Sequence, residues 1–161
     1  DAWIEAQLTT ARGLLEPLGV TVERAPDEPY PPIPAAVETR AQRDVAVRSG
    51  VSPVVHVVVV ALLRDVDTPP DERRGVHWRV RGEPARRGIL LSRIASSLVF
   101  THELGHYLGL GHSQERNNVM SYVHDEGGVP FFTAQQGATL RANALAVLAS
   151  GEVKPRRSGS P

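Results

Sequence analysis

The chain has 161 residues, with 18 basic and 18 acidic side chains and no cysteine. Balanced charge argues against nucleic acid or an anionic membrane as the natural partner. No apolar run approaches the 18 or so residues that span a bilayer, no signal peptide opens the chain, and no disulfide framework can form. A chain of this length can bury a core of its own, so we expect one domain.

The first third of the chain predicts two amphipathic helices joined by an irregular stretch. Apolar residues recur at helical spacing over residues 1–16, with Asp1 placed to cap the helix. Residues 20–23, Val-Thr-Val-Glu, indicate a strand. The five prolines of residues 25–34 favour an extended surface connection, and residues 35–49 predict the second helix.

Two strands are expected in the middle of the chain. Residues 53–63 are too β-branched for a helix and too continuously apolar for a half-exposed strand, which predicts a central strand buried on both faces. Residues 75–82 alternate apolar and polar side chains, so they indicate a half-buried strand.

The polar loop between these strands carries four carboxylates: Asp65, Asp67, Asp71 and Glu72. Such a group could hold Ca²⁺, but no fixed ligand spacing supports a calcium site here.

The last third of the chain predicts two more helices. Residues 94–108 are apolar nearly all round, which indicates a buried helix. Residues 133–149 form the other, with Thr133 and Gln136 at capping-box spacing. The apolar residues on one face of this last helix are Ala138, Ala142, Leu145 and Leu148.

A dense histidine motif lies at the end of the buried helix and just beyond it. It reads His102-Glu103-Leu104-Gly105-His106-Tyr107-Leu108-Gly109-Leu110-Gly111-His112. Residues four apart on a helix lie one turn apart on nearly the same face, so His102 and His106 can bind one ion. Gly109 is suited to end the helix and let the chain turn, so that His112 supplies a third ligand.

The ligand set predicts a catalytic metal rather than a structural one. Three neutral nitrogens without a thiolate leave the fourth position of one tetrahedral Zn²⁺ open to water, whose pKa zinc lowers to about 7. Glu103 lies beside the two helical histidines and is not needed as a ligand. We expect it to take the proton of this water as the water attacks a carbonyl, and then to pass the proton to the leaving amine.

This motif resembles the zinc signature of the metzincin metallopeptidases, and Asn118-Val119-Met120-Ser121-Tyr122 resembles the methionine turn of that family. The resemblance implies an α/β fold with a twisted mixed, mostly parallel sheet, an active-site helix and a small C-terminal helical subdomain. The catalytic domain would span residues 1–152, with an upper part to residue 112, a lower part from residue 113, and a disordered tail over residues 153–161. Met120 would form a hydrophobic floor under the histidines, with ordinary core packing as the alternative.

Two branches of the family are similar to this chain at different positions. Ser113 directly after the third histidine is similar to the matrix metallopeptidases, or matrixins. The Met120-Ser121-Tyr122 sequence is similar to serralysins and astacins, in which a tyrosine at this position can bind the metal. Tyr122 could therefore be a fifth ligand that swings away from the metal, a donor to the developing oxyanion, or a half-buried wall residue.

The resemblance also implies how a substrate would bind. In this family the edge strand at the rim of the cleft pairs antiparallel with an extended substrate, and the candidates here are residues 75–82 or 89–92. Val99 could touch the substrate in the first pocket beyond the cleaved bond, or could pack in the core. Val123 begins the loop of residues 123–130, which the family would place beside the same pocket.

These observations predict a zinc-dependent endopeptidase that hydrolyses internal peptide bonds of extended polypeptides through a metal-bound water activated by Glu103. The alternatives are a zinc amidohydrolase acting on a non-protein substrate and a non-catalytic zinc-containing binding module. Glu103 and the open ligand position argue against the binding module, because neither is needed to hold a fold together. We expect a monomer whose partner is its polypeptide substrate. The family resemblance implies that the protein is secreted.

Overall fold

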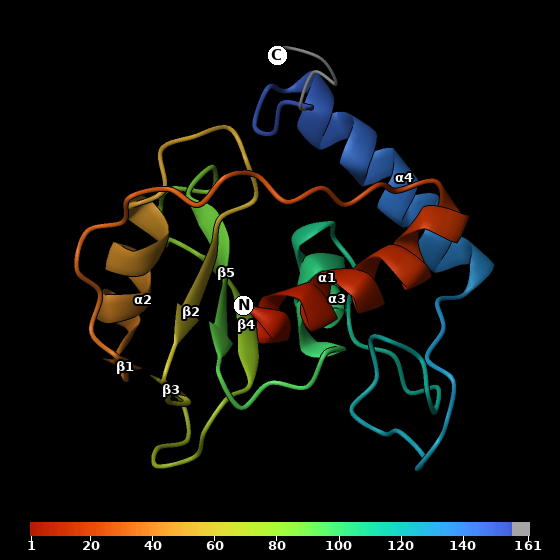
Figure 1. Ribbon diagram of the computed structural model, residues 1–161, viewed down its shortest axis with the longest axis horizontal. Helices are drawn as coiled ribbons and strands as arrows, with labels where there is room; N and C mark the ends of the chain where they lie inside the picture. The colour runs from red at the N-terminus through yellow and green to blue at the C-terminus, as the bar shows by residue number, and fades with distance from the viewer. Residues whose placement is uncertain (156–161) are drawn as a thin grey trace.

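The computed structural model describes residues 1–155 (Figure 1). Within this range the elements are α1 (Ala2–Leu15), the 3₁₀ helix η1 (Glu16–Leu18), β1 (Ala36–Val37), α2 (Arg40–Arg48), β2 (Val57–Val60), β3 (Leu62–Leu63), β4 (Gly75–Arg79), β5 (Arg87–Ser92), α3 (Val99–Tyr107) and α4 (Ala134–Ala149). The fold is mixed α/β, as predicted. None of the helices in these residues is long and apolar enough to cross a membrane.

The strands form a three-stranded sheet, in the order β2-β5-β4, and a separate pair, β1-β3. β2 runs parallel to β5, β1 runs parallel to β3, and β4 runs antiparallel to β5. The register places Val58 opposite Leu90 and His77 opposite Ile89. The expected mixed sheet is confirmed: two of the three pairings are parallel, and residues 75–79 of the expected strand 75–82 form an edge strand.

The core lies on both faces of β5, the central strand. Ile89 and Leu91 point to one face, where they pack in a cluster with residues of α1 and α3 such as Leu15 and Phe100. Leu90 points to the other face and packs with residues of α2 such as Val47. Alternate side chains of a strand point to opposite faces, so the consecutive apolar residues Ile89, Leu90 and Leu91 need helices on both sides of β5. The helix that carries the histidine motif is thereby packed against the sheet.

Two expectations about strands were wrong. Residues 20–23 form no strand; the carbonyl of Val22 instead accepts a hydrogen bond from Arg12 Nε (3.1 Å). The apolar run at residues 53–63 is not one central strand but the two short strands β2 and β3. β2 lies at an edge of its sheet, and Val57 is 39% exposed. Continuous apolar character indicated burial but could not say which strand has neighbours on both sides.

Helix positions were predicted better than helix faces and ends. The Asp1 cap of α1 and the Thr133–Gln136 capping box of α4 are both present. Helices α2 and α3 begin about five residues later than expected, α2 because Thr39 and Gln42 form a capping box there. The predicted packing face of α4 was wrong. It is exposed, and the buried residues of the helix are Gly137, Leu140 and Val147.

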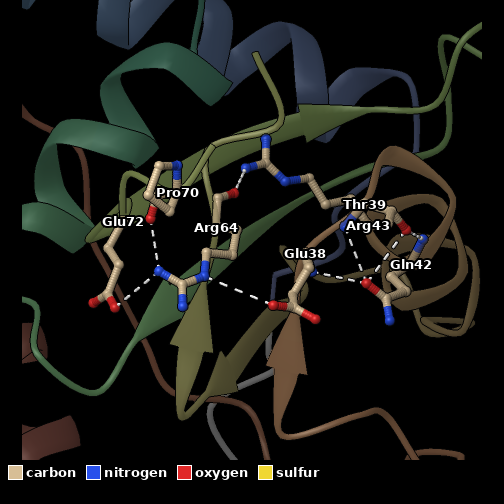
Figure 2. A network of polar contacts seen from close by, with 7 residues as sticks. All are labelled: Glu38, Thr39, Gln42, Arg43, Arg64, Pro70 and Glu72. Carbon is tan, nitrogen blue, oxygen red and sulfur yellow. Dashed lines mark hydrogen bonds and ion pairs between the residues drawn. The ribbon is translucent and has the colours of Figure 1, made fainter. Parts of the chain in front are cut away.

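A polar network ties the start of α2 to the loop that follows β3 (Figure 2). Arg64 donates to the carbonyl of Pro70 (2.6 Å) and contacts the carboxylates of Glu72 (3.3 Å) and Glu38 (3.7 Å). The buried Arg43 of α2 donates to the carbonyl of Arg64 (2.5 Å). These contacts hold the loop that leads into β4, the edge strand.

The chain end closes against the core through a second charged cluster. Glu152 accepts hydrogen bonds from Arg87 Nε (2.7 Å) and Nη2 (3.0 Å) and from the Tyr107 hydroxyl (2.5 Å). Val153 and Lys154 donate main-chain bonds to Val147 and Pro53. Of the tail expected over residues 153–161, residues 156–161 lie outside the described residues.

Candidate metal centre

Helix α3 brings the first two histidines of the motif together and then ends in a tight turn. Gly109 has a φ of 88° and donates its N–H to the carbonyl of His106 (3.0 Å), and Leu110 donates to Gly105 (2.9 Å). A left-handed residue at this point ends a helix without the steric cost that a Cβ would bring. The turn predicted at Gly109 is confirmed, and it returns the chain so that His112 faces the helix.

The three imidazoles meet at one point. His106 Nε2 lies 3.1 Å from His102 Nε2 and 3.1 Å from His112 Nε2. Each residue offers one nitrogen to a group whose members all lie within 4.8 Å of one another. Tetrahedral zinc with Zn–N distances of about 2.0–2.1 Å separates neighbouring ligand nitrogens by about 3.3 Å, so the spacing fits one such ion.

The outer nitrogens of the two helical histidines are bonded to main-chain carbonyls. His102 Nδ1 lies 2.7 Å from the carbonyl oxygen of Val119, and His106 Nδ1 lies 2.8 Å from that of Leu110. A carbonyl can only accept, so we assign the ring protons to Nδ1, which leaves Nε2 of each ring with a free lone pair. Lone pairs that face one another at 3.1 Å repel unless a cation lies between them. The donor set is therefore arranged for a metal ion.

The electrostatics of the rings also favour neutral ligands. Burial lowers the pKa of His102 to about 4, although its hydrogen bond to Val119 acts in the opposite direction. Burial, together with the neighbouring His106, lowers the pKa of His112 as well. A metal ligand must be a neutral imidazole, so low pKa values keep the site ready to bind near pH 7.

The methionine turn lies directly beneath α3. Met120 is fully buried, and a Cβ placed on Gly105 would lie 2.5 Å from its sulfur. Gly105 lies between the two helical histidines in the sequence, so its lack of a side chain lets the sulfur approach the helix at the level of the site. This is the position that the methionine-turn resemblance implies for Met120.

A pair of amides holds this turn, and sequence reasoning did not find it. Buried Asn118 accepts the main-chain N–H of Met120 (2.9 Å). Its side chain also exchanges two hydrogen bonds with Gln136, at 2.8 and 3.1 Å. Gln136 was noticed only as part of the α4 capping box. Gln136 can bond both Thr133 in the capping box and Asn118 in the turn, because its amide offers donors and an acceptor.

Glu103 is buried under the edge strand. Its Oε2 accepts the main-chain N–H of His77 in β4 (2.6 Å). Burial raises the pKa of Glu103 to about 7, against the lowering effect of that hydrogen bond and of Arg73 and Arg43. A carboxyl group with a pKa near neutral pH can both accept and return a proton, which is what a general base that later acts as an acid requires.

Tyr122 reaches the same point from outside the helix. Its hydroxyl lies 2.6 Å from His112 Nε2, the nitrogen that faces the other two imidazoles. The side chain as a whole is 68% exposed, so it stands over the histidine group rather than within the core.

The two residues suggested for the substrate pocket lie in different surroundings. Val99 is half-buried beneath the edge strand, where a Cβ on Gly75 would lie 2.6 Å from its Cγ1, and it packs against the core around α1 and β5. Val123 follows Tyr122 and is 47% exposed.

The acidic loop after β3 does not gather its carboxylates. Asp65 is bonded to Arg73 Nε (2.6 Å) and to the main-chain N–H of Asp67 (2.9 Å), and Asp67 itself pairs with Arg40. Across residues 1–155, the three histidines are the one group of three or more metal-binding side chains close enough to share an ion. The structure thus adds no support for calcium.

Fold and site agree with the family resemblance seen in the sequence. One buried helix and the turn after it bring three imidazoles together within a mixed α/β fold, an arrangement similar to that of metzincins. Residues 65–134 match the family model described as Matrixin, so this part of the chain is matrixin-like. The match includes β4, β5, α3 and the methionine turn, and it bears out the resemblance to the matrixin branch. A comparison with curated proteins found no match.

Proposed function

We propose that the chain is a zinc-dependent endopeptidase, with His102, His106 and His112 as the zinc ligands and Glu103 as the general base and acid. The observation that carries the proposal is the meeting of three imidazole nitrogens, two of them from the helix that also holds the buried carboxylate of Glu103. The matrixin match supports a metallopeptidase family and the use of zinc. In this proposal residues 1–152 act as one catalytic domain.

The reaction would be the addition of water across a peptide bond. Bound zinc would supply a Lewis acid that lowers the pKa of a water to about 7 and polarises the substrate carbonyl. Glu103 takes one proton from the water while the water oxygen forms a bond to the carbonyl carbon. The C–N bond then breaks, and Glu103 returns the proton to the leaving nitrogen, so the products are a carboxylic acid and an amine.

Two further side chains take supporting roles in this proposal. Tyr122, whose hydroxyl is 2.6 Å from His112 Nε2, would donate a hydrogen bond to the oxyanion that develops on the carbonyl. Met120 supports the histidines from below, because its sulfur packs against Gly105 of α3.

The substrate we propose is an extended polypeptide that pairs with main-chain groups at the edge of β4 other than the N–H of His77, which Glu103 accepts. Main-chain pairing recognises any extended peptide, and preference for particular side chains would come from a pocket, for which Val99 and Val123 are the candidates. Matrixins are commonly extracellular, and we extend this to a secreted, monomeric enzyme here.

The test is to map cut sites in a denatured protein mixture by mass spectrometry, with the zinc-loaded chain beside its Glu103→Ala variant. We expect cuts from the parent alone, clustered before one type of side chain, and equal zinc content in both proteins. If both hold zinc and neither cuts, a non-protein amide substrate or a non-catalytic binding module becomes the better reading.

A further inference from the structure

The edge strand donates a main-chain N–H to the carboxylate proposed as general base. His77 lies opposite Ile89 of β5, and the N–H of Ile89 goes to His56 on the other side. Opposed residues of an antiparallel pair exchange both main-chain bonds or neither, so the N–H of His77 points away from β5. It is this outward N–H that Glu103 accepts at 2.6 Å. Helix α3 lies beside β4 in the fold (Figure 1).

The contact depends on a missing side chain two residues earlier in the same strand. A Cβ on Gly75 would lie 2.9 Å from Glu103 Cγ, 3.1 Å from Glu103 Oε1 and 2.6 Å from Val99 Cγ1. Real Cβ atoms essentially never approach other heavy atoms closer than 3.0 Å. A side chain at residue 75 would therefore enter the space that Glu103 occupies.

We propose that Gly75 is a positioning residue for the general base: its lack of a side chain lets Glu103 lie against the edge strand and be oriented by the N–H of His77. This inference rests on the proposed function of Glu103. A short hydrogen bond from a main-chain donor to a carboxylate is strong and directional. The strand proposed to hold the substrate backbone also holds the general base. Strand β4 would therefore fix the position of Glu103 relative to the substrate.

The first test compares Gly75→Ala with the parent chain, and with Gly13→Ala as a control. Gly13 lies in α1, and a Cβ there meets no atom within 4 Å. For Gly75→Ala we expect kcat on an internally quenched peptide to fall about 10²-fold, the size of loss that a displacement of about 1 Å can cause. KM and zinc affinity should change little. Hydrogen exchange of the His77 N–H should become faster in the same variant, a readout that requires no activity.

The second test separates positioning from simple crowding. Val99→Ala removes the methyl group nearest to the new Cβ, but the new Cβ still lies too close to Glu103. The double variant Gly75→Ala/Val99→Ala should therefore fold, and its kcat should still be lower than that of Val99→Ala alone. In a Glu103→Ala background, Gly75→Ala should leave the residual rate unchanged, because the residue it acts through is gone.

Each other result overturns the assignment. Full activity of Gly75→Ala, recovery of kcat by Val99→Ala, or loss of zinc from Gly75→Ala would each show that Gly75 does not act through Glu103. If the zinc-loaded parent cleaves no peptide at all, the proposed function fails, and this role for Gly75 fails with it. A parent that cleaves beside an equally active Gly75→Ala variant refutes the Gly75 inference alone.

Discussion

The Tyr122 hydroxyl lies 2.6 Å from Nε2 of His112, the nitrogen that the His112 ring presents to the other two imidazoles. The hydroxyl is therefore within reach of an ion bound there and of a carbonyl oxygen beside that ion. Tyr122 needs its hydroxyl both as a fifth ligand and as an oxyanion donor. Removal of the hydroxyl should weaken zinc binding in the first case and lower kcat in the second.

Tyr122→Phe should lower kcat about 10²-fold, the loss typical of one oxyanion donor, with zinc affinity nearly unchanged. The ring keeps its place, so only the hydroxyl is tested. Peptide kinetics and competitive zinc titration measure the two effects. Weakened zinc binding with normal kcat would instead favour the ligand role, and no change in either would leave Tyr122 as a wall residue.

Gln136→Ala should weaken zinc binding about 10- to 100-fold, because it removes the partner of Asn118 and so loosens the turn whose Val119 carbonyl orients His102. Gln135→Ala is the matched control, since Gln135 is exposed on the same helix turn. Zinc titration of both variants, with circular dichroism to check α4, makes the comparison. Equal affinities would mean that the amide pair does not support the site.

Glu152→Ala should destabilise the fold by about 1–3 kcal/mol, because it leaves the Arg87 guanidinium and the Tyr107 hydroxyl without their shared acceptor. Burial would raise the pKa of Glu152, but the hydrogen bonds from Arg87 and Tyr107 lower it overall. Urea unfolding measures the loss, with Glu126→Ala, an exposed carboxylate, as control. A loss no larger than that of the control would show that the cluster contributes little.

Asp65 should make stability depend on pH at the acid end. Hydrogen bonds from the Asp67 N–H, and then from Thr68 and Arg73, lower the pKa of Asp65 to about 2 in the folded chain. The unfolded value is near 3.9, so the ionised group stabilises the fold above about pH 4, and this contribution is lost as the pH falls towards 2. Between pH 5 and pH 2 the melting temperature of Asp65→Asn should fall less with decreasing pH than that of the parent chain. An unchanged slope would rule out this role.

Local pattern was enough to predict the histidine site. The spacing of His102 and His106 is a property of a single helix, and the turn at Gly109 follows from the one residue type that takes a positive φ freely. The capping box of Thr133 and Gln136 is equally local. These three features, each set by residues within one helix or one turn, are found at the predicted positions.

Features set by distant partners could not be predicted in this way. The face of α4 that packs inward was missed because alanine and leucine occur all round the helix, and the buried side is chosen by Gly137 and its close approach to Leu18. The Asn118–Gln136 pair and the Glu103–His77 bond join residues 18 and 26 positions apart. No sequence periodicity signals which amides or carboxylates will meet at such separations.

The zinc X-ray absorption spectrum of the loaded chain, together with its zinc stoichiometry, tests the three-histidine zinc site most directly. We expect one zinc per chain with three nitrogen ligands at about 2.0–2.1 Å and oxygen in the remaining position, and loss of the site in His112→Ala. A zinc bound by four nitrogens, or one retained unchanged in His112→Ala, would contradict a catalytic centre built on these three histidines.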